Sequence, residues 1–151
     1  MVWGRMTAKR PVYLAKIEGG LNADLYCDIL DDDLFKTITW YGLDRKKVIF
    51  QHDNDPKHTA KKTMSWIKEN DLVVLEWPAQ SPDLNPIEHL WDHLKRRLAN
   101  YERMPSGINE LWERVQVEWG KIKKDDCIHL IDSMQSRIAA VIEAKGGYTK
   151  Y

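Results

Sequence analysis

Two short apolar runs separated by a helical stretch place the strongest constraint on how this chain can fold. Residues 48–50 read Val-Ile-Phe and residues 72–75 read Leu-Val-Val-Leu, continuous runs that are typical of buried parallel strands. Between them, Thr59 opens a stretch of helical periodicity that closes near Asn70. A helix between two such strands is the usual right-handed crossover of a parallel sheet. The sequence therefore predicts a β-α-β unit over residues 48–75.

The stretch before this unit predicts a hairpin and a helix. Residues 1–6 and 11–17 are β-prone and are joined by residues 7–10. A glycine pair at residues 19–20 ends the second strand, and Asn22 is a suitable N-cap for the helix that follows. This helix carries its apolar residues on one side: Leu25, Tyr26, Ile29, Leu30 and Leu34.

After the β-α-β unit the chain is predicted to be a proline-rich loop followed by helices. The loop contains Pro78, Pro82 and Pro86, and proline is favoured in the first turn of a helix. Beyond Pro105 one helix spans residues 108–119, and a last helix carries apolar residues from Leu130 to Ile142 and stops at Gly146-Gly147. The order hairpin, helix, strand, helix, strand, helices indicates a mixed α/β layer architecture.

Composition is consistent with one globular domain. The chain has 151 residues, 43% hydrophobic and 30% charged, and no apolar run long enough for a membrane span, so no membrane partner is expected. Cys27 and Cys127 have neither a metal-binding nor a redox spacing. The formal net charge is zero, which is unusual for a protein that handles DNA.

Two acidic residues stand where a metal site could form. Asp53 stands three residues after the first apolar run, Glu88 opens the helix after the proline-rich loop, and 34 residues lie between them. Carboxylates from a strand end and from a helix start can converge on a divalent cation, which prefers oxygen ligands. Two such cations can hold the attacking and leaving oxygens of a phosphodiester exchange.

Each of the two acids also has a structural interpretation. Asp53 begins an Asp-Asn-Asp-Pro turn, in which Asp55 is a competing ligand whose side chain is expected to point elsewhere. Glu88 stands three residues after Asn85, where the glutamate of a capping box belongs. On a helical wheel, however, Glu88 lies at the border of the apolar face, where a cleft ligand would also lie.

Histidines and basic residues add further candidates. His52 and His58 flank the Asp53 turn and are expected either to position phosphate or solvent or to pack. His89 and His93 have the i, i+4 spacing of a zinc pair, which makes a zinc protein an alternative, although both are expected to face solvent. Among several basic clusters, one adjoins Glu88 on the same helix and is the best candidate for phosphate contact: Lys95, Arg96 and Arg97.

Several stretches, in order along the chain, carry a resemblance to a known family. They are residues 1–4 (Met-Val-Trp-Gly), 50–60, 77–91 and the C-terminal stretches 133–138 and 141–151. The loop that ends in Ser-Pro-Asp-Leu-Asn-Pro-Ile-Glu at residues 81–88 and the 34-residue interval are its specific signals. With these motifs the chain resembles the DDE transposases of the mariner superfamily, in the branch whose third acid is glutamate.

The resemblance implies a fold, a chemistry and a set of partners. It implies an α/β, ribonuclease-H-like mixed sheet flanked by helices, with Asp53 and Glu88 as the second and third acids of the catalytic triad. It implies Mg²⁺ as cofactor, with Mn²⁺ as a substitute. It also implies transposon-end and target DNA as partners, a homodimer for the intact enzyme, and a nuclear location.

The chain departs from the family at its N-terminus. In the family the first catalytic aspartate lies on a strand upstream of the Val2-Trp3-Gly4 stretch, and helix-turn-helix DNA-binding domains come before it. Residues 1–151 are therefore expected to be a partial catalytic domain that lacks the first strand and is inactive alone. A non-catalytic DNA-binding or interaction module derived from a transposase is the alternative.

Overall fold

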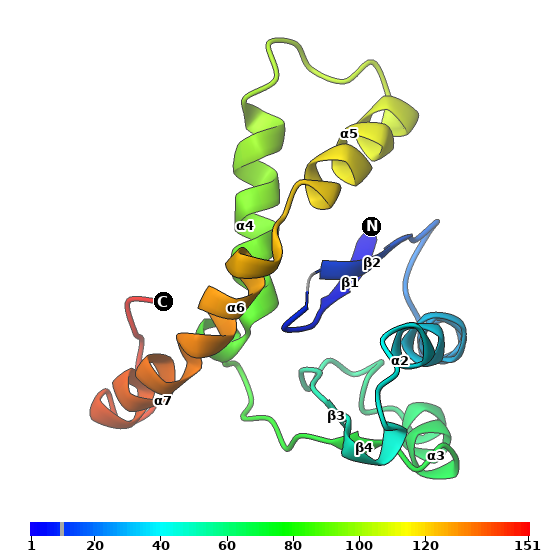
Figure 1. Ribbon diagram of the computed structural model, residues 1–151, viewed down its shortest axis with the longest axis vertical. Helices are drawn as coiled ribbons and strands as arrows, with labels where there is room; N and C mark the ends of the chain where they lie inside the picture. The colour runs from blue at the N-terminus through cyan, green and yellow to red at the C-terminus, as the bar shows by residue number, and fades with distance from the viewer. Residues whose placement is uncertain (10) are drawn as a thin grey trace. The chain divides into compact units, whose positions relative to one another are not determined.

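The computed structural model describes residues 1–9 and 11–151 (Figure 1). The chain divides into two compact units. The first unit comprises residues 1–2 and 17–80, and the second comprises residues 3–16 and 81–151. No helix among the described residues is both long and apolar enough to cross a membrane.

The first unit begins with the helix predicted after Asn22. The Asn22 side chain accepts a hydrogen bond of 2.8 Å from the N–H of Leu25, so it caps the helix as expected. Helix α1 (Ala23–Ile29) continues into a π-helical segment, η1 (Leu30–Leu34), and then into α2 (Phe35–Trp40). Four apolar residues of the predicted stripe are buried, namely Tyr26, Ile29, Leu30 and Leu34, and Leu25 is half-buried.

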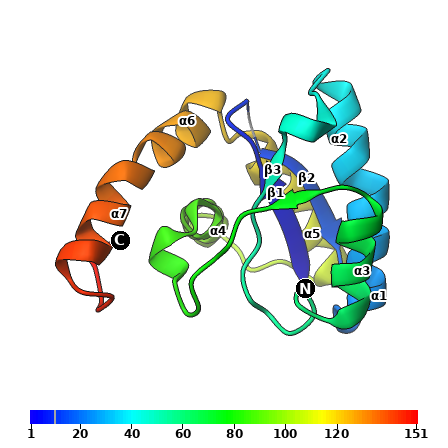
Figure 2. The same cartoon turned by 90° about the horizontal axis from the view of Figure 1, so that it is seen from below.

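The β-α-β unit is present in the first unit. Strands β3 (Ile49–Phe50) and β4 (Val73–Val74) pair in parallel, with Ile49 opposite Val73. Helix α3 (Lys61–Glu69) connects them and packs beside α1 (Figure 2). The helix begins two residues after Thr59, because the Thr59 N–H and hydroxyl both donate to the carbonyl of Asp55 in the preceding turn.

One detail of the strand prediction is wrong. Both apolar runs were expected to be buried on both faces, but Ile49 and Val73 are 65% and 49% exposed, whereas Phe50 is buried. Successive side chains of a strand point to opposite faces. The described part of this sheet has only two short strands, and Phe50 is buried on one of its faces while Ile49 and Val73 are exposed on the other.

A two-stranded sheet and a helix pair make up much of the second unit. Strands β1 (Val2–Met6) and β2 (Pro11–Lys16) form the predicted hairpin; Arg10, in the expected connection, lies outside the described residues. Helices α4 (Pro86–Ala99) and α5 (Ile108–Gly120) pack together through stacked Trp91 and Trp119 rings, 4.8 Å apart. Gly4 of β1 is close to Trp91, since a Cβ there would lie 2.7 Å from its ring.

The C-terminal helix differs from the prediction. A single helix was expected, but the structure has α6 (Lys124–Asp132) and α7 (Met134–Glu143) with a break at Ser133. The Ser133 hydroxyl donates to the carbonyl of Leu130 and accepts from the Nε of Arg137, so a local side-chain bond interrupts the helix. Two 3₁₀ turns complete the described elements, η2 (Arg45–Lys47) and η3 (Pro82–Leu84).

Candidate active site

Asp53 lies in the turn that follows β3, and its carboxylate is held at one oxygen. Asp53 Oδ1 accepts the N–H of Asp55 at 3.1 Å and lies 2.6 Å from Nδ1 of His58. Asp53 Oδ2 has no hydrogen-bond partner among the described residues, and the side chain is 52% exposed. The carboxylate is therefore oriented by its own turn while its second oxygen stays available to a cation.

His58 owes its position to a stack of aromatic rings. Its side chain is 12% exposed, and its ring centroid lies 4.2 Å from that of Tyr26 and 5.3 Å from that of His52. Tyr26 comes from α1 and is almost completely buried, and its hydroxyl lies 3.1 Å from Nδ1 of His52. The stack fixes the imidazole ring that contacts Asp53.

The electrostatics of this cluster favour the uncharged forms of His52 and Tyr26. Burial lowers the pKa of His52 to about 4, with neighbouring His58 acting in the same direction, so His52 is neutral at pH 7. Burial also raises the pKa of Tyr26, and the charge of Asp53 adds to that effect. A protonated Tyr26 can donate to Nδ1 of His52, which places the His52 proton on Nε2.

Both carboxylate oxygens of Asp55, the next acid in the turn, are bonded to Lys57. Its Oδ1 accepts the N–H of Lys57 at 3.1 Å, and its Oδ2 forms an ion pair with the Lys57 ammonium group. Burial acts to raise the pKa of Asp55, but the bonds to Lys57 outweigh it and lower the pKa. Asp55 is committed to its own turn, which leaves Asp53 as the better ligand.

Glu88 stands in the first turn of α4 and is exposed. Asn85 and Pro86 occupy the N-cap and first helical positions as predicted, but the capping-box interpretation is wrong. The Asn85 side chain makes no cap hydrogen bond; its Nδ2 lies 3.5 Å from Oε1 of Glu88. Because η3 comes just before the helix, the Asn85 N–H donates to the carbonyl of Pro82 instead.

The metal chemistry of the site rests on two oxygen donors. Asp53 belongs to the first unit and Glu88 to the second, and their convergence on one cation stays a prediction. Exposed carboxylates suit a hard cation such as Mg²⁺ or Mn²⁺. Within residues 1–9 and 11–151, no three or more His, Cys, Asp or Glu side chains are grouped to hold a metal ion.

The histidine pair on α4 has little support as a zinc site. His93 is exposed and His89 is half-buried, and burial lowers the pKa of His89, with the charge of Arg137 adding to the effect. The prediction that both face solvent is therefore right for His93 only. Zinc needs a third and usually a fourth protein ligand, and none is grouped with this pair among the residues that the structure describes.

The three predicted DNA-binding residues occupy different environments on α4. Lys95 is exposed, and Arg96 is exposed and paired with Asp92 one turn earlier. Arg97 is half-buried, and its Nη1 donates to the carbonyl of Glu118 on α5 at 3.3 Å. Lys95 and Arg96 remain accessible to phosphate, whereas Arg97 is part of the packing between the two helices.

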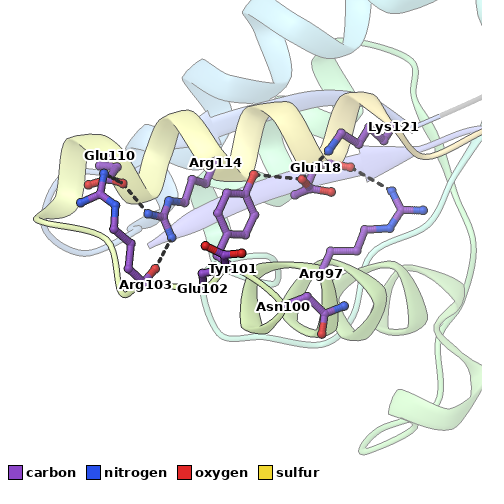
Figure 3. Close-up of a pocket in the computed structure, with 9 residues that line it drawn as sticks. All are labelled: Arg97, Asn100, Tyr101, Glu102, Arg103, Glu110, Arg114, Glu118 and Lys121. Atoms are coloured by element: carbon purple, nitrogen blue, oxygen red, sulfur yellow. Dashed lines mark hydrogen bonds and ion pairs between the residues drawn. The ribbon is translucent and has the colours of Figure 1, made fainter.

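Arg97 also lines a pocket between α4 and α5, which Figure 3 shows in close-up. Glu110 accepts from Ser106 and pairs with Arg103 and Arg114, and Glu118 pairs with Lys121 and accepts from Tyr101. The bonds from Ser106, followed by that from Arg114, lower the pKa of Glu110 to about 2. The residues that line the pocket are Arg97, Asn100, Tyr101, Glu102, Arg103, Glu110, Arg114, Glu118 and Lys121.

Sequence reasoning missed two groups of side chains. Tyr26 was assigned to an apolar helix face, although a buried tyrosine hydroxyl needs a polar partner and was therefore a signal. The Glu110 and Glu118 networks were also missed. The Glu110–Arg114 spacing of i, i+4 was their visible signal.

Comparison with known proteins assigns the chain to a family. Residues 1–111 match the family described as DDE superfamily endonuclease. The chain belongs to this family. It is similar to the Tcb1 transposase of Caenorhabditis briggsae, with 40% identity over 151 residues, and to the Tc1 transposase of Caenorhabditis elegans, with 38% over 153 residues. Both matches include 100% of this chain and 54% of the relative, so the chain spans about half the length of these relatives.

Solved structures agree on the fold. The catalytic domain of Mos1 mariner transposase superposes with a TM-score of 0.86 at 22% identity, covering 99% of this chain and 75% of that chain. Other Mos1 structures with TM-scores of 0.85–0.86 contain raltegravir with Mg or with Mn, or are paired-end complexes with a left transposon end. The predicted mixed α/β, ribonuclease-H-like fold and the predicted transposase resemblance are thereby confirmed.

Proposed function

We propose that this chain contributes to the catalytic domain of a DDE transposase, in which Asp53 and Glu88 hold divalent cations for DNA cleavage and strand transfer. The observation that carries the proposal is the geometry of Asp53. Its Oδ1 is held by a backbone N–H and by His58, while its exposed Oδ2 has no hydrogen-bond partner among the described residues. A carboxylate that only shaped the turn would not need a buried imidazole to orient it.

The residues of the chain fit Mg²⁺ or Mn²⁺ by donor chemistry. Bound cations of this kind polarise a phosphodiester and activate a hydroxyl for attack. Asp53 would hold a cation through Oδ2, and Glu88 would hold it through its exposed carboxylate in the first turn of α4. Support comes from the structures of the Mos1 catalytic domain with raltegravir and Mg or Mn.

DNA is the proposed partner, both as transposon end and as target. Lys95 and Arg96 would contact phosphates, because they are the exposed cations of the cluster that follows Glu88 on α4. The family assignment and the Mos1 paired-end complex with a transposon end support this partner. A homodimeric intact enzyme and a nuclear location, both implied by the family resemblance, are also part of the proposal.

Binding of Mn²⁺ to the purified chain tests the metal assignment. Binding would be measured by electron paramagnetic resonance for the parent and for Asp53→Asn and Glu88→Gln, with Asp28→Asn and Glu113→Gln as controls on exposed acids. Loss of binding in both site variants, with both controls unchanged, is the expected result. Equal binding by all five proteins would overturn the assignment and leave a non-catalytic DNA-binding module as the function.

A further inference from the structure

The C-terminal stretch of the chain contains a buried arginine that the proposed site does not use. Arg137 on α7 is 2% exposed and heads the largest fully buried side chains of the described residues. Its Nε donates to Oγ of Ser133 and its Nη1 donates to the carbonyl of Asp83, each at 2.8 Å. Its guanidinium group lies 5.0 Å from the centre of the Tyr151 ring.

Burial of this guanidinium group indicates a specific task. Removing a charge from water is costly, and a well-packed apolar side chain of similar size often stabilises a core as well or better. An arginine offers several donors in fixed directions, which an apolar side chain cannot. One of the N–H donors of Arg137 bonds to a backbone carbonyl that is 54 residues away in the sequence.

A second contact holds the same residue from the end of the chain. After α7 the chain turns back (Figure 1), and the Thr149 hydroxyl donates to Oδ2 of Asp83 at 2.9 Å. The N–H of Tyr151 donates to the Thr149 hydroxyl oxygen at 3.3 Å. Asp83 is thus held at its carbonyl by Arg137 and at its carboxylate by Thr149.

Asp83 lies in the turn that sets the start of α4. It is the central residue of η3, where the N–H of Leu84 donates to Ser81 and the N–H of Asn85 donates to Pro82. Leu84 and Pro86 are buried on either side of Asn85. The direction of this turn therefore decides where the first turn of α4 begins.

We propose that Arg137, Thr149 and Tyr151 form a C-terminal latch on Asp83 that positions Glu88. The latch acts through the η3 turn, so its three members are positioning residues and do not touch the reacting atoms. The structural part rests on the contacts of Arg137 and Thr149 with Asp83, and on those of Tyr151 with Arg137 and Thr149. The consequence for metal binding rests on the proposed function, because it requires Glu88 to be a ligand.

Amide hydrogen exchange tests the latch directly. Exchange would be followed by mass spectrometry in peptides covering residues 81–90, with peptides from α1 and α3 as internal references. Thr149→Val removes the hydroxyl with little change of shape, and Arg137→Lys keeps the charge but cannot span both acceptors. The matched controls are Thr39→Val and Arg103→Lys, both at exposed positions.

Each latch variant is expected to speed exchange at the amides of residues 84, 85, 87 and 88 by about fivefold, the effect of losing one hydrogen bond. The reference peptides and the control variants should be unchanged, and Thr149→Ser should restore slow exchange. Unchanged exchange in Thr149→Val, or an equal rise in every peptide, would overturn the latch. If Arg137→Lys does not fold, the exchange rates of Thr149→Val alone test the latch.

Mn²⁺ affinity separates the latch from the proposed function. Weaker binding in Thr149→Val, alongside faster local exchange, supports positioning of Glu88. Faster exchange with parental Mn²⁺ affinity, when Glu88→Gln abolishes binding, would show that the latch does not position the ligand. Unchanged binding in Glu88→Gln itself would instead defeat the metal assignment and leave the structural latch to stand on its exchange data.

Discussion

His58 Nδ1 lies 2.6 Å from Oδ1 of Asp53, and the ring that makes this contact is packed against Tyr26. The backbone N–H of Asp55 holds the same oxygen. The pair couples an exposed carboxylate to a buried stack of rings, so the orientation of Asp53 depends on packing that begins in α1.

Removing the His58 ring is expected to weaken metal binding. His58→Ala should lower Mn²⁺ affinity by about 10- to 100-fold, the usual effect of losing a partner that orients a ligand. His58→Asn should keep part of the affinity, because its amide can donate from a similar position. Isothermal titration with His129→Ala, on an exposed histidine, as the control measures this effect. Parental affinity in His58→Ala would contradict the orienting role.

The Glu110 carboxylate is expected to make folding sensitive to acid. Its pKa is lowered from 4.5 to about 2, chiefly by Ser106. The folded state binds fewer protons than the unfolded state in this range, so the stabilisation is present above pH 4.5 and is lost as the pH falls toward 2. Unfolding midpoints measured across this range should fall less steeply in Glu110→Gln than in the parent. Glu113→Gln should follow the parent, and identical curves for all three proteins would refute the prediction.

Gly4 is expected to tolerate no side chain. A Cβ at this position would lie 2.7 Å from the Trp91 ring and 3.2 Å from the carbonyl of Tyr13, so Gly4→Ala should cost about 1–3 kcal/mol of unfolding free energy. Gly120→Ala is the matched control, because nothing lies within 4 Å of its Cβ position. Urea unfolding compares the two variants. A smaller loss in Gly4→Ala than in Gly120→Ala would show that the Trp91 contact yields easily.

Charge removal should separate the three basic residues of α4. Lys95→Gln and Arg96→Gln should each weaken duplex binding uniformly across sequences and reduce the salt slope by about 1. Arg97→Gln should instead lower the unfolding midpoint, because Arg97 bonds to α5. Fluorescence anisotropy at several salt concentrations measures binding, with Lys36→Gln, on an exposed lysine paired with Asp32, as the control. Equal slopes for Lys95→Gln and Lys36→Gln would exclude Lys95 from the DNA contact.

Local patterns predicted most of the elements. The two apolar runs and the helix between them became β3, α3 and β4 because apolar periodicity and strand length are properties of contiguous residues. The same holds for the cap at Asn22 and for the start of α4 at Pro86. The pattern did not predict the break at Ser133, since a serine within a helical stretch has either role until its partner is known.

The same distinction between local patterns and long-range contacts applies to the candidate site. The sequence alone determined that Asp53 follows a strand and that Glu88 opens a helix, because turn residues, prolines and apolar spacing act over a few neighbours. Only the tertiary structure decided that Tyr26 and His58 support Asp53, that Arg97 faces α5 rather than solvent, and that Arg137 holds Asp83. A buried polar side chain must find a partner, and packing between distant segments determines which partner it meets.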